Sequence, residues 1–78
     1  MKLSNKQADA LKAWVNGAVI LYATEKTRSQ VGPAMTVNAL CKRGLICKVE
    51  DGYQLTALGV AVLRRRGFFT RPLGANVE

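Results

Sequence analysis

The sequence predicts one small α+β domain, in which helices accompany a two-stranded antiparallel β-hairpin. Three observations carry this prediction: helical periodicity over the first 16 residues, a second helical pattern that ends at a basic pair before Gly44, and an Asp-Gly pair at 51–52 between two apolar-leaning strands. The 78 residues suffice for one domain, assigned to residues 1–67. Residues 68–78 have no helical or strand periodicity and are interpreted as a tail, in which Phe68 and Phe69 either close the core beneath the last helix or contact a second subunit.

The first helix is predicted to begin after Ser4, which forms a capping-box pattern with Gln7. Asn16-Gly17 is predicted to end it. Its inward positions recur at spacings of three and four residues: Ala8, Leu11, Trp14 and Val15. The short apolar run at 18–22 then predicts a buried strand, and its last residue, Tyr22, is interpreted together with Tyr53 as a core or wing-packing residue.

The segment at 23–31 leaves two alternatives open, a single helical turn or a loop that leads to an extended stretch. A helix is predicted to start at Pro33, because proline suits the first helical position, and to end at Gly44. Its apolar positions are Met35, Val37, Leu40 and Cys41. The positions predicted to face solvent are Thr36, Asn38, Lys42 and Arg43.

The predicted hairpin consists of strands at 45–49 and 53–55, joined at Glu50-Asp51-Gly52. Thr56 is expected to cap a last helix, which ends in three arginines followed by Gly67. Leu58 and Val62 are expected to face the core, together with Leu55.

The charge of +7, from 12 basic and 5 acidic residues, favours a polyanionic partner. Nucleic acid comes first and an acidic protein surface second, and a charge excess that only aids solubility is the alternative. The densest cluster, Arg64-Arg65-Arg66, would neutralise several phosphates together with Arg71. Its alternative role is favourable electrostatics at the end of a helix.

Enzyme, metal and membrane functions find no support in the sequence. There is no histidine, and the spacing of Cys41 and Cys47 does not match a zinc site, so no metal and no cofactor is predicted. We interpret both cysteines as reduced, buried thiols, with a disulfide between them as the alternative. No stretch suits a bilayer span or a signal sequence, so a cytoplasmic protein without a membrane partner is expected.

Three segments together suggest a family: "LSNKQADAL" near the start, "TVNALCKRGLI" in the middle and "GYQLTALGVAVL" after it. Their order and spacing resemble the winged helix-turn-helix domains of bacterial and phage transcription regulators, over residues 3–66. The resemblance implies binding of double-stranded DNA by a small transcriptional regulator that occupies its operator. It also implies that a homodimer is an option, in which Phe68 and Phe69 would contact a second subunit.

The resemblance further implies that the helix at 33–43 is the recognition helix. Thr36 and Asn38 would then contact bases, with Lys42 or Arg43 on phosphate and Lys48 reaching phosphate from the side of the wing. Two features depart from the family pattern, the short segment before this helix and the acidic turn at 50–51. They favour the alternative of a protein-interaction module with an acidic or nucleic-acid-binding partner, such as a phage-encoded inhibitor of a host nucleic-acid-handling or CRISPR-type defence complex.

Overall fold

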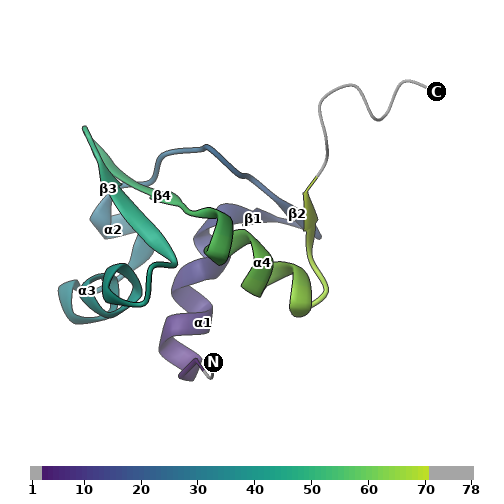
Figure 1. Ribbon diagram of the computed structural model, residues 1–78. Coiled ribbons are helices and arrows are strands. Elements are labelled where there is room, and N and C mark those ends of the chain that lie inside the picture. The colour runs from purple at the N-terminus through teal and green to yellow at the C-terminus, as the bar shows by residue number, and fades with distance from the viewer. Residues whose placement is uncertain (1–2, 71–78) are drawn as a thin grey trace.

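The computed structural model describes residues 3–70, which form a small α+β domain with four α-helices and two small β-sheets (Figure 1). The helices are α1 (Asn5–Leu11), α2 (Arg28–Val31), α3 (Ala34–Lys42) and α4 (Ala57–Arg65). One sheet has the order β1 (Val15–Asn16), β2 (Val19–Ile20) and β5 (Phe69–Thr70), and the other pairs β3 (Ile46–Val49) with β4 (Gly52–Leu55). The α+β prediction is confirmed, while Arg71 and the rest of the predicted tail after it lie outside the described residues.

Helix α1 begins as predicted but ends early. The Ser4 hydroxyl accepts a hydrogen bond from the Gln7 amide at 3.2 Å, and the Ser4 amide donates to Gln7 Oε1 at 3.3 Å, which completes the capping box. After Leu11 the chain tightens into a 3₁₀ turn at Lys12–Trp14. Val15, predicted to be helical, instead pairs with Ile20 in an antiparallel ladder. The predicted strand at 18–22 is therefore confirmed at its centre, with a partner that the sequence did not indicate.

Strand β5 lies in the segment that was interpreted as a tail. It runs parallel to β2, with Phe69 opposite Val19 and Thr70 opposite Ile20. Phe68 packs against the core, whereas Phe69 stays half exposed. The interpretation as a tail therefore does not hold for Phe69 and Thr70. A strand of two residues is too short to show alternation, so only its contact with β2 reveals it.

The segment before α3 forms a single helical turn, the first of its two alternatives. The Thr27 amide donates to Gln30 Oε1 at 2.8 Å, and Val31 is buried. Gly32, at a φ of 141°, then turns the chain into α3. Helix α2 is thus a short element that brings one apolar side chain to the core.

The hairpin forms as predicted, and a third chain segment pairs with its edge. Its register pairs Ile46 with Leu55 and Lys48 with Tyr53. On the outer side of β4, the Lys26 amide donates to the Tyr53 carbonyl at 2.9 Å and the Tyr53 amide donates to the Lys26 carbonyl at 2.8 Å. The segment between β2 and α2 therefore adds to the hairpin along the edge of β4.

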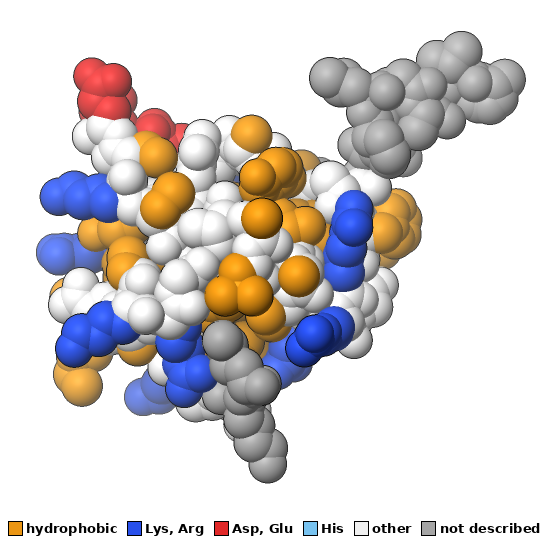
Figure 2. All heavy atoms as spheres, viewed as in Figure 1, with side chains coloured by type: hydrophobic (Ala, Val, Ile, Leu, Met, Phe, Trp, Pro, Cys, Tyr) orange, Lys and Arg blue, Asp and Glu red, His pale blue; other side chains and the backbone are white. Residues whose placement is uncertain are grey.

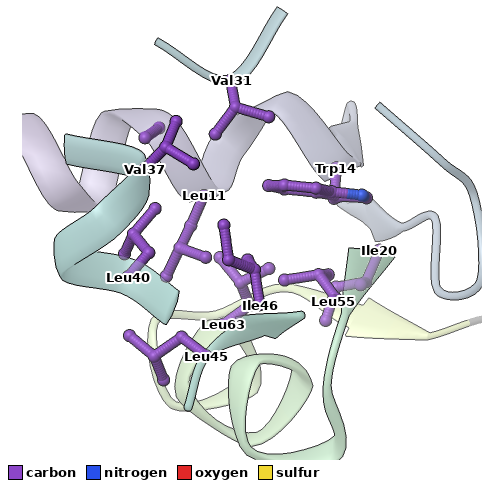
Figure 3. Close-up of a cluster of buried hydrophobic side chains, with 11 residues drawn as sticks. Leu11, Trp14, Ile20, Val31, Val37, Leu40, Leu45, Ile46, Leu55 and Leu63 are labelled. Atoms are coloured by element: carbon purple, nitrogen blue, oxygen red, sulfur yellow. The ribbon is translucent and has the colours of Figure 1, made fainter. Parts of the chain in front are cut away.

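The core lies between α1, α3, α4 and the hairpin, with Trp14 at the edge nearest β2 (Figure 3). Trp14 is fully buried, and its indole Nε1 donates to the Thr24 carbonyl at 2.8 Å. The buried core side chains come from all four α-helices and from the segments between them: Ala10, Leu11, Trp14, Ile20, Val31, Val37, Leu40, Leu45, Ile46, Leu55 and Leu63. The prediction of a core tryptophan is confirmed. For Tyr22 the core alternative is wrong, because its side chain is 50% exposed.

Helix α4 starts at its predicted cap, where the Thr56 hydroxyl accepts from the Gly59 amide at 3.1 Å. Its core face carries Gly59 and Leu63, and not Leu58, which is 45% exposed. The prediction for Leu58 was wrong because Gly59 lets the helix approach the backbone of Leu45, and this contact sets which side of α4 is buried.

Candidate nucleic-acid interface

Helix α3 is the element on which the candidate interface depends. Its buried side carries Val37 and Leu40, which pack into the core against α1. Arg43 ends the helix, and Gly44, at a φ of 76°, supplies the left-handed cap residue that was predicted. The opposite side of α3 faces solvent and contains no acidic residue. That side is free to meet a negatively charged partner.

The structure separates the two residues that were predicted to contact bases. Thr36 and Asn38 are two positions apart, and on a helix with 3.6 residues per turn this spacing turns their directions about 200° away from each other. Asn38 is exposed, whereas Thr36 is half-buried. Thr36 lines a hollow of about 340 Å³ between α1 and the start of α3, together with Lys6, Asp9, Ala10, Val31 and Pro33. The two side chains therefore do not serve one surface.

Met35, and not Thr36, is exposed in the first turn of α3. It was predicted to be an inward apolar position, but it is 85% exposed, so this prediction was wrong. Met35, Asn38 and Lys42 follow one another at spacings of three and four residues, which places them on one stripe of the helix. This spacing was already present in the sequence, but the apolar character of methionine concealed it. The exposed stripe of α3 is therefore Met35, Asn38 and Lys42, with Arg43 following at the end of the helix.

The hairpin contributes one cation and an acidic tip. Lys48 is exposed on β3, which packs beside α3. Glu50 and Asp51 form the turn between β3 and β4, and Figure 2 shows the acidic side chains at that tip, away from α3. The tip would repel a phosphate backbone, whereas Lys48 would attract it. The basic contribution of the hairpin therefore comes from its side and not from its tip.

Eight of the ten basic residues among 3–70 belong to two parts of the chain, and the other two, Lys6 and Lys12, lie on α1 and the 3₁₀ turn after it. Residues 26–49 contain five basic residues and no acidic one: Lys26, Arg28, Lys42, Arg43 and Lys48. The arginines 64–66 are exposed at the other end of the molecule, where α4 ends (Figure 1), and Arg64 donates to the Thr70 hydroxyl at 3.3 Å. Figure 2 shows basic side chains both over α3 and β3 and over the end of α4. The predicted phosphate-binding residues therefore divide between two surfaces.

An apolar hollow of about 370 Å³ lies on the outer side of α4, next to Arg64. It is lined by Tyr22, Ala57, Val60, Ala61 and Arg64. Hydrophobic side chains are visible over this part of the molecule in Figure 2. Alanines at 57 and 61 open the hollow because they are four residues apart and therefore share one side of the helix.

The two cysteines are free, but they differ in their surroundings. Cys41 is partly buried against the core and Cys47 is exposed on β3, so the prediction of two buried thiols was wrong for Cys47. Burial raises the pKa of the Cys41 thiol, and the nearby Cys47 raises it further. The neighbouring Lys42 and Arg43 are not among the causes of the shift. Cys41 is accordingly a poor nucleophile at neutral pH.

We expect iodoacetamide to alkylate Cys47 before Cys41 in the folded protein at pH 8. The thiolate is the reactive form, and a raised pKa leaves less of it on Cys41, which is also less accessible. Peptide mapping by mass spectrometry over a time course measures both rates. In denaturant the two rates should converge, and equal rates in the folded protein would contradict this difference in environment.

Within residues 3–70, no group of three or more histidine, cysteine, aspartate or glutamate side chains is arranged to hold a metal ion. Over the same range, no helix combines the length and the apolar character that a bilayer span requires. No protein-family model, curated protein or solved structure matches this chain.

Proposed function

We propose that this chain is a winged-helix protein that binds double-stranded DNA through α3 and β3 and acts as a small bacterial or phage transcriptional regulator. The observation that carries the proposal is the exposed stripe of α3, where Asn38 and Lys42 stand in line and no carboxylate interrupts them. Asparagine offers the paired donor and acceptor that suit adenine, and lysine neutralises phosphate. Occupation of an operator would then act sterically.

The order of the elements supports the same proposal. Apart from the β1–β2 hairpin, which is inserted after α1, the order of α1, the bridge at Lys26, α2, α3 and the hairpin β3–β4 is that of a winged helix-turn-helix domain. In this arrangement the segment around Lys26 pairs with Tyr53 and so extends the wing by a third chain segment. Helix α2 takes the place of the first helix of the helix-turn-helix pair, and its four residues keep it a departure from the family pattern.

A direct test is fluorescence anisotropy with labelled random-sequence duplex DNA across a salt series. We expect binding in the micromolar range or tighter at about 50 mM salt, because each neutralised phosphate releases counterions. The double variant Lys42→Ala/Arg43→Ala should weaken binding and reduce the slope of log K against log salt by about 2, at roughly 0.9 per phosphate contact.

The matched control removes the same charge from the other basic surface, as Arg64→Ala/Arg65→Ala. This variant should change the slope less than the α3 variant does, because the end of α4 lies away from α3 (Figure 1). The absence of binding at about 50 mM salt would refute DNA binding. A larger effect of the α4 variant would move the DNA-binding surface to the arginines.

A second candidate function is protein interaction, and the apolar hollow on α4 favours it. Tyr22 and the alanines of α4 offer an apolar surface with Arg64 beside it, which suits an apolar partner that also carries acidic groups. The acidic turn at 50–51 also favours protein interaction, because it disfavours a close approach of the wing to phosphate. A phage-encoded inhibitor of a host nucleic-acid-handling or CRISPR-type defence complex would have these properties.

A further inference from the structure

Met35 is the most exposed large hydrophobic side chain among residues 3–70, at 85% of its surface. It lies in the first turn of α3, beside the exposed Ala34 and three residues before Asn38. It is not part of the core cluster, and it does not line the hollow that holds Thr36. Its side chain therefore makes no visible contribution to the packing of the domain.

The chemistry of the major groove offers one partner for such a group. Every base edge there presents hydrogen-bond donors or acceptors, and the 5-methyl group of thymine is the only large apolar feature. A thioether side chain has no donor and is only a weak acceptor, so it cannot compete for the polar edges of guanine, adenine or cytosine. An exposed methionine on a helix that enters the groove is thus suited to thymine.

We propose that Met35 contacts the methyl group of a thymine in the major groove and makes thymine the preferred base at one position of the DNA site. This inference rests on the proposed DNA binding by α3. It assigns base recognition to Met35 and Asn38, which lie about 5–6 Å apart at their Cβ atoms on one helix face. Thymine recognition by Met35 and adenine recognition by Asn38 then predict an A/T-containing core in the site.

The test begins with selection of bound duplexes from a random-sequence pool by the full-length chain. The thymines of the best selected duplex are then replaced one at a time by deoxyuridine, which removes only the 5-methyl group and keeps the base pair. We expect one replacement to weaken wild-type binding about fourfold, which is the value of one buried methyl group. In Met35→Ala the same replacement should have no effect.

Two further variants complete the test. Met35→Leu keeps an apolar side chain of similar size and should retain the discrimination against deoxyuridine. Leu58→Ala removes another exposed apolar side chain, on α4, and should leave the discrimination at its wild-type value. Far-UV circular dichroism should show all these variants folded, because both positions are exposed.

The outcomes separate this inference from the proposed function. Sequence-selective binding without any effect of deoxyuridine, or with the same effect in Met35→Ala, overturns the role of Met35 and leaves DNA binding intact. Binding without enrichment of any sequence also overturns base recognition by Met35. A complete lack of duplex binding overturns both.

Discussion

Replacement of Gly59 by alanine is expected to destabilise the domain by at least about 2 kcal/mol, as overpacking of a closely packed site does. A Cβ at this position would overlap the Leu45 carbonyl oxygen and would lie 2.9 Å from Leu55 Cδ2. The backbone of Leu45 cannot move freely, because its carbonyl also accepts the Thr56 amide at 3.1 Å. For a domain of this size, the change corresponds to a fall in melting temperature of roughly 10 °C.

The sign of this effect makes the experiment decisive. At an ordinary helical position the change from glycine to alanine stabilises by about 1 kcal/mol, so a steric cost must exceed that gain. Urea unfolding followed by circular dichroism measures the difference. Ala61→Gly on the exposed side of the same helix is the matched control and should cost only about 1 kcal/mol. A Gly59→Ala variant that is more stable than the wild type would contradict the close approach of α4 to Leu45.

Replacement of Trp14 by alanine should cost about 3–5 kcal/mol, the usual range for the loss of a buried aromatic side chain. Trp14 is fully buried and is the largest side chain in the core. A single core in a domain of this size rarely supplies more than about 3–5 kcal/mol, so a large fraction of Trp14→Ala molecules should be unfolded at 37 °C. Thermal unfolding followed by far-UV circular dichroism measures this loss without using tryptophan fluorescence.

Two comparison variants define the cause of that loss. Trp14→Phe keeps an aromatic ring but removes the donor to the Thr24 carbonyl, and it should cost less than the alanine variant. Met35→Ala removes an exposed side chain of the same chain and should leave the melting temperature unchanged. A Trp14→Ala variant that melts within 2–3 °C of the wild type, a shift worth less than about 1 kcal/mol, would show that the ring does not support the core.

The candidate interface depends on the core, because the core holds α3 in place. Helix α3 is held from behind by Val37 and Leu40, which pack in the same core as Trp14 and Leu63. The buried side chains of α3 therefore fix the direction in which its exposed stripe faces. Loss of DNA binding in Trp14→Ala or Gly59→Ala would report unfolding, whereas loss in Lys42→Ala/Arg43→Ala in a folded protein would report the interface itself.

The sequence predicted part of the candidate interface. The exposed positions of Asn38, Lys42 and Arg43 followed from helical spacing and were predicted correctly. Thr36 was predicted to be exposed and Met35 to face inward, but Thr36 is half-buried and Met35 is exposed. The sequence shows that methionine is apolar, but it does not show that the start of α3 turns this side chain outward. The arginines at 64–66 were predicted to neutralise phosphates, but no local sequence pattern indicates that the end of α4 lies apart from α3 (Figure 1).

Local chemistry determined most of the elements on its own. The Ser4 and Thr56 caps, the left-handed Gly44 and the Asp-Gly turn each act over a few residues, so their effect can be predicted without knowing the fold. Only the tertiary structure decided the pairing of β5 with β2, the bridge from Lys26 to Tyr53 and the choice of Gly59 over Leu58 as the buried side of α4. These three features depend on contacts between segments far apart in the chain, where backbone approach and packing outweigh local preference.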